Sequence, residues 1–103
     1  MTNEEAPSIP LFVKVCSDGA AFEVRIQRKV FFNMDKVRQL FEACHDPEIV
    51  VHTPHMIILR SGRVEITLSR DGRMLIKRVS NESEATQVAR KILRRAQTAA
   101  FKP

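Results

Sequence analysis

The residues best suited to chemistry in this sequence are basic side chains grouped near its end. Arg90, Lys91, Arg94 and Arg95 fall within one short stretch. Guanidinium and ammonium groups so placed suit phosphates, and such binding releases counterions and weakens with salt. The alternative interpretation is an ordinary solvated helix face, because cations are favoured near a helix C-terminus. The stretch therefore has both a functional and a purely structural explanation.

Basic residues also lie near the ends of predicted hairpins, where they can extend an anion-binding surface: Arg60, Arg63, Arg70 and Arg73. Lys77, on the strand that follows, is a further candidate for anion binding. Residues 60–103 hold 11 Lys or Arg and 4 Asp or Glu, whereas residues 1–59 hold 6 and 8. The net charge of +5 is therefore carried by the second part of the chain. A basic half favours an anionic partner, such as nucleic acid or an acidic protein surface.

One face of the predicted sheet is expected to remain open and largely polar. Its candidate binding residues are Arg25, Gln27, Thr67, Arg73 and Lys77. Glu23 and Glu65 fall on the same face and repel phosphates. The face also lacks the aromatic platform on which single-stranded bases stack. This composition speaks against nucleic acid on the open face.

The only metal-like grouping is Cys44, His45, His52 and His55. Cys44-His45 and His52-x-x-His55 can in principle close a zinc site. The spacing matches no established pattern, and Cys44 also fits the apolar stripe of a helix. We therefore predict no metal and no other cofactor.

Motifs for catalysis are missing from the sequence. It has no glycine-rich phosphate loop, no nucleophile elbow and no informative pair of carboxylates. The three glycines, at 19, 62 and 72, each fit a turn. Cys16 and Cys44 lack the spacing of a disulfide framework and are predicted to be reduced, small buried hydrophobes. The sequence therefore predicts a protein that is not an enzyme.

Length and composition predict one domain. A chain of 103 residues, 44% of them hydrophobic, can bury one core. We expect a disordered lead-in over 1–8, one α+β domain over 9–97 and a frayed tail over 98–103. No apolar run approaches the roughly 20 residues of a membrane helix, and the acidic start does not resemble a signal peptide. We therefore expect a cytoplasmic protein without a membrane partner.

The elements that position these side chains are clearest in residues 63–96, which read as strand, turn, strand and helix. A three-residue loop ending at Gly72 pairs Leu68 with Met74, and the apolar side chains of both strands then share one face. Asn81 is suited to cap a helix whose apolar stripe packs on that face.

The earlier residues complete the predicted fold. They read as a hairpin of strands 11–16 and 22–27, a helix that opens at Asn33 and stops near 45–46, and strands 49–51 and 56–59. Together the elements predict an α+β fold in two layers, with an antiparallel sheet of about five strands and both helices packed on one face.

Residues 66–92 resemble the end of one half-repeat of the TATA-box-binding protein family. The shared pattern is strand, Asp71-Gly72-Arg73-Met74 turn, strand, acidic helix start, then Ala89-Arg90-Lys91 in the helix. A weaker similarity links the segment to the tail of ubiquitin-activating-like adenylyltransferases and to small archaeal proteins of this fold. The resemblance implies half of the TATA-binding-protein fold, and a homodimer can then rebuild a two-half saddle. The wedge phenylalanines of that family have no match in this sequence.

We therefore expect a small non-catalytic interaction module that binds a protein partner or a second copy of itself through its sheet face or edge. The alternative is a nucleic-acid-binding protein that uses the basic second half. An accessory role beside an enzyme, by analogy with the adenylyltransferase tail, comes third.

Overall fold

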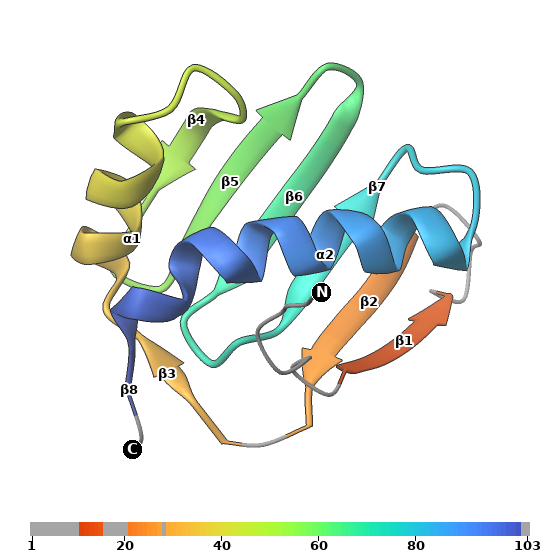
Figure 1. Cartoon of the computed structure of the whole chain (residues 1–103), viewed down its shortest axis with the longest axis horizontal. Helices are drawn as coiled ribbons and strands as arrows, with labels where there is room; N and C mark the ends of the chain where they lie inside the picture. Colours follow the sequence, from red (N-terminus) through yellow and green to blue (C-terminus); the bar gives the residue numbers. More distant parts are fainter. Residues whose placement is uncertain (1–10, 16–20, 28, 102–103) are drawn as a thin grey trace, which may run out of the picture.

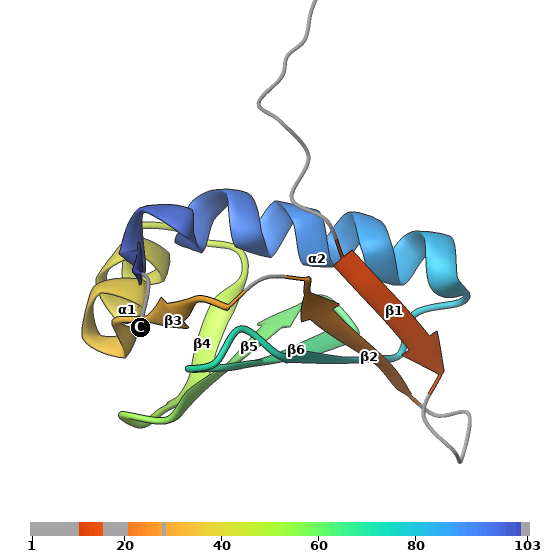
Figure 2. The ribbon, with the colours of Figure 1, turned by 90° about the horizontal axis from the view of Figure 1, so that it is seen from below.

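The computed structural model describes residues 11–15, 21–27 and 29–101 of the chain. Six strands form one antiparallel sheet in the order β1-β2-β7-β6-β5-β4. Their bounds are β1 (Leu11–Val15), β2 (Ala21–Ile26), β4 (Glu48–His52), β5 (Met56–Ser61), β6 (Val64–Ser69) and β7 (Met74–Lys77). Helices α1 (Met34–Glu42) and α2 (Glu82–Ala96) lie on the same side of this sheet (Figures 1 and 2). The α+β class is confirmed, with six strands in the main sheet where about five were expected.

The hairpin of β6 and β7 has the predicted register. Leu68 pairs with Met74, and Ile66 pairs with Ile76. The Ser69 amide donates to the Arg73 carbonyl oxygen at 2.8 Å and closes the three-residue loop. This register places the buried side chains of both strands on the face toward the helices.

Both predicted helix caps are confirmed. The side-chain oxygen of Asn33 accepts from the Lys36 amide at 3.1 Å, and that of Asn81 accepts from the Glu84 amide at 2.9 Å. These bonds satisfy amides that have no partner within the helix. The first helix ends at Glu42, earlier than predicted, and its last turn is tightened by the Cys44 amide, which donates to the Phe41 carbonyl at 3.1 Å.

The hydrophobic core lies between the two helices and one face of the six-stranded sheet. Its fully buried side chains include Val24, Val37, Ile57, Leu59, Leu68, Met74, Ile76 and Ala89. Because successive side chains of a strand point to opposite faces, Glu65, Thr67 and Ser69 point away from the helices. We call that second side of the sheet the uncovered face, since nothing in the described part of the chain lies over it (Figure 2).

The end of the chain differs from the prediction that residues 98–103 fray. A short 3-10 helix, η1 (Gln97–Ala99), leads into β8 (Ala100–Phe101), which pairs with β3 (Phe31–Phe32) in a second sheet. The rings of Phe31 and Phe101 meet edge to face, with centroids 6.2 Å apart. Apolar contact and strand pairing thus hold residues 100–101 in place. The sequence did not predict these strands, because two residues are too short to show a periodic pattern. The predicted lead-in over 1–8, Cys16 and residues 102–103 lie outside the described residues.

Candidate functional site

The centre of the uncovered face is crossed by a row of largely apolar side chains. Val51, Ile58, Thr67 and Leu75 are consecutive cross-strand neighbours on β4, β5, β6 and β7. We call these four residues the apolar row. Val51 is 39% exposed, and the other three are half-buried. Three of these four side chains have no polar group to offer water, so the row is suited to contact with another apolar surface.

A second row is charged throughout. It lies two residues further along β5, β6 and β7, and three further along β4 because of the register shift there. Glu48, Arg60, Glu65 and Lys77 are also consecutive cross-strand neighbours on β4 to β7. We call them the charged row. Its sign alternates from strand to strand, so each residue lies beside an opposite charge, which stabilises a sheet modestly. The charged row therefore borders the apolar row with both signs in equal number.

Glu23, which the sequence places on this face as a source of repulsion, is engaged by cations. The Arg25 guanidinium donates to its carboxylate at 2.7 Å, and the Lys14 ammonium lies 3.8 Å away. The hydrogen bond from Arg25 is the main cause that holds the pKa of Glu23 below its usual range, and it also raises the pKa of Arg25. The negative charge of the Glu23 carboxylate is therefore offset by these two neighbouring cations.

The predicted sheet-face residues are brought together in part. Thr67 and Arg73 line one shallow hollow of about 280 Å³, which Glu23 and Leu75 also line. Lys77 belongs to the charged row. Gln27 lies at the end of the sheet, where its amide donates to the Leu11 carbonyl at 3.1 Å.

The basic residues of α2 do not form one surface with the basic turn residues. Lys91, Arg94 and Arg95 line a hollow of about 520 Å³ beside α1, which we call the basic hollow. Its other lining residues are Leu40, Phe41, Asp46, Pro47, Ile92 and Thr98. Arg90 is half-buried and does not line it. Arg70 lies elsewhere, with its guanidinium carbon 5.2 Å from the centre of the Phe31 ring.

Three arginines meet at the opposite end of the sheet from Arg70. Arg60, Arg63 and Arg78 line a hollow of about 370 Å³ together with Glu65. The backbone of Arg78 has φ of +67°, a conformation that residues other than glycine rarely adopt. The Arg78 guanidinium lies 3.8 Å from the Glu65 carboxylate. The sequence contains no signal for this backbone conformation, and Arg78 was not among the predicted site residues.

The weak metal candidates are not brought together. The His52 ring nitrogen lies 3.2 Å from the Met34 carbonyl oxygen and 3.6 Å from Asp35, while the Cys44 thiol donates to the Leu40 carbonyl at 3.5 Å. Within the ranges that the structure describes, no three His, Cys, Asp or Glu side chains group as metal ligands would.

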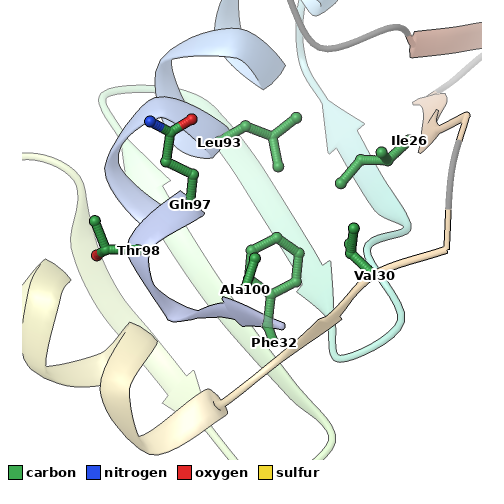
Figure 3. A pocket seen from close by; sticks show the side chains of 7 residues that line it. All are labelled: Ile26, Val30, Phe32, Leu93, Gln97, Thr98 and Ala100. Atoms are coloured by element: carbon green, nitrogen blue, oxygen red, sulfur yellow. The ribbon is translucent and has the colours of Figure 1, made fainter. Parts of the chain in front are cut away.

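An apolar pocket of about 350 Å³ lies under the end of α2 (Figure 3). Its lining residues are Ile26, Val30, Phe32, Leu93, Gln97, Thr98 and Ala100. Among the described lining residues, Gln97 and Thr98 supply the polar side chains, and none of the seven is ionisable. The described lining of the pocket is therefore neutral.

Comparison of the chain with protein-family models, curated proteins and solved structures finds no match. Among the described residues, no helix has both the length and the apolar character needed to cross a membrane. The proposal below therefore depends on the geometry of the surface alone.

Proposed function

We propose that this protein is a small non-catalytic interaction module that binds a protein through the uncovered face of its sheet. The apolar row carries the proposal, because it lies at the centre of a face that no other described element covers. Apolar side chains bordered by polar ones are typical of protein contact surfaces. The charged row supplies the polar border, and its two signs favour a partner of complementary pattern.

The same face is less suited to a polyanion. Its acidic side chains, Glu23, Glu48 and Glu65, lie among its cations and each would oppose a phosphate. We also propose, on the sequence pattern alone, that the chain is related to a half-repeat of the TATA-box-binding protein fold. That relation agrees with a sheet whose open face binds a partner.

Photo-crosslinking tests the proposal. A photoreactive amino acid at Thr67 stands in the apolar row, and a matched one at Gln87 stands on the exposed side of α2. We expect position 67, and not position 87, to give a covalent adduct with a protein, whether a second copy or another chain. No adduct at position 67, or equal adducts at both positions, would contradict the proposed function.

A second candidate function is nucleic-acid binding through the basic hollow. The observation that favours it is the gathering of Lys91, Arg94 and Arg95 around one hollow with a single carboxylate, Asp46. Apolar side chains of Leu40 and Ile92 also line it. Cations at such a hollow can hold successive phosphates.

Salt dependence tests this second candidate. Replacing Lys91, Arg94 and Arg95 by glutamine is expected to weaken binding to duplex and single strands alike, and to reduce the slope of affinity against salt. Lys29 and Lys36, both exposed and not among the lining residues, give a matched control in which charge is lost elsewhere. Absence of binding at low salt would remove this candidate.

A further inference from the structure

We infer that the protein bound by the uncovered face is a second copy of this chain. The two copies pack face to face about a two-fold axis that runs along the strands, between β5 and β6. The inference rests on the function proposed above, because it names the partner of the same surface.

The charged row is self-complementary about this axis. Its signs run negative, positive, negative and positive from β4 to β7. A two-fold rotation between β5 and β6 exchanges these two strands and also exchanges β4 with β7. Glu48 then faces Lys77 of the second copy, and Arg60 faces its Glu65. All four residues meet an opposite charge, as an isologous interface requires.

The apolar row meets itself under the same rotation. Val51 faces Leu75 of the second copy, and Ile58 faces Thr67. Apolar contact at the centre with charged pairs beside it is the usual arrangement of an interface core and its rim. One axis therefore matches both rows.

The neighbouring axis does not give this match. A rotation between β6 and β7 exchanges β5 with β2, and Arg60 then faces Ala21. In the adjacent row it sets the Glu23 carboxylate, with its partners Arg25 and Lys14, against the apolar Ile58, which offers no polar group in place of the water lost. The axis between β5 and β6 is thus the one we infer.

Pairing through the β4 edge of the sheet is also less favourable. The edge strand β4 has an irregular register between Ile49 and Val51, and Pro47 and Pro54 stand on either side of it. Bulges and prolines are the features by which proteins prevent edge-to-edge pairing. The face is therefore a better surface for a second copy than the β4 edge, and the dimer differs from the edge-joined saddle that the sequence suggested.

The overlapping surface predicts a weak dimer. Four strands about 4.8 Å apart and five residues long present a face of roughly 19 by 17 Å. Such an area belongs to the small, transient class of interfaces. Association is therefore expected at about 50 μM to about 1 mM of protein.

Charge reversal in two separate chains tests the inference. Lys77→Glu alone and Glu48→Lys alone each place like charges opposite one another in both contacts, so each variant is expected to stay monomeric. When one copy of each variant forms a dimer, both contacts between positions 48 and 77 join opposite charges. A heterodimer is therefore expected in an equimolar mixture. Lys36→Glu is the control, because Lys36 is an exposed residue of α1 and α1 lies on the other side of the sheet. This variant is expected to associate as the wild type does.

Sedimentation velocity reads the outcome as a shift from 11.8 kDa toward twice that mass. The inference is overturned if the wild type remains monomeric across this range, or if the mixture associates no better than its components. Arg60→Glu mixed with Glu65→Arg repeats the test independently, in case a first pair fails to fold by circular dichroism. A monomeric chain that still crosslinks another protein from position 67 would overturn this inference while the proposed function stands.

Discussion

Replacing Gly72 by alanine tests the loop that sets the register of the central hairpin, and Gly62 provides the matched control. Both glycines have positive φ, +91° at Gly72 and +59° at Gly62. An alanine at Gly62 meets no atom within 4 Å, whereas the new methyl carbon at Gly72 lies 3.2 Å from Ile26 Cδ1 and 3.4 Å from Val30 Cγ2. The two variants therefore share backbone strain and differ in packing.

The expected magnitudes follow from that difference. A left-handed L-residue costs roughly 1–2 kcal/mol, so Gly62→Ala should lower the free energy of unfolding by about 1 kcal/mol. Overpacking adds roughly 1–3 kcal/mol, so Gly72→Ala should lose about 2–4 kcal/mol in total. At this chain length each kcal/mol of additional loss lowers the melting temperature by roughly 4–8 °C relative to Gly62→Ala.

Urea denaturation followed by far-ultraviolet circular dichroism is the suitable assay, since the chain has no tryptophan or tyrosine to report by fluorescence. Ile26→Val removes the Cδ1 atom nearest the new methyl group. In the Gly72→Ala background it should therefore cost less than in the wild type, with a coupling of about 0.5–1 kcal/mol. Equal losses for the two glycine variants, or additive effects with Ile26→Val, would refute the packing argument.

Three further predictions concern a helix cap, an ion pair and the two faces of the sheet. Asn81→Ala removes the acceptor at the start of α2 and should cost about 1 kcal/mol in urea denaturation, with Asn81→Gly losing less. Glu23→Gln removes a carboxylate whose pKa is lowered mainly by the hydrogen bond from Arg25. The lowered pKa stabilises the fold at pH values above the pKa of Glu23 in the unfolded chain, and this contribution is lost as the pH falls through its pKa in the folded chain. Glu23→Gln should therefore be less stable than the wild type at pH 7, and its stability should decrease less on acidification. Leu68→Ala, fully buried, should cost about 2–5 kcal/mol, whereas Leu75→Ala on the uncovered face should cost clearly less, and equal costs would show that the faces are wrongly assigned.

The fold could be predicted where local rules and packing agree. Alternation in β6 required its apolar side chains to share a face with those of β7, and the three-residue loop 70–72 satisfied that requirement where a two-residue loop would not. Asn33 and Asn81 were recognisable because a side-chain acceptor stood just before each apolar helical stripe. The pairing of β3 with β8 was not predictable, because two-residue strands joined across most of the chain have no periodicity of their own.

The candidate site could be predicted only in composition. The sequence identified the basic residues, but their distribution over three separate places depends on which end of the sheet each turn occupies. Val51, Ile58 and Leu75 look like core residues in the sequence, since an apolar side chain on an uncovered face has the same local pattern as a buried one. Cross-strand register alone shows that they lie in one row with Thr67.

The alternating charged row has two possible causes, and they make different predictions about mixtures. Opposite charges on adjacent strands stabilise the sheet of a single copy, so alternation would arise even in a monomer. Any row that alternates over four strands is also complementary to itself about the middle of the row. Mixing Lys77→Glu with Glu48→Lys separates these causes, because it restores no pair within either chain. Association of the mixture would therefore come from contacts between the copies, whereas a role confined to one copy leaves both variants monomeric together as well as apart.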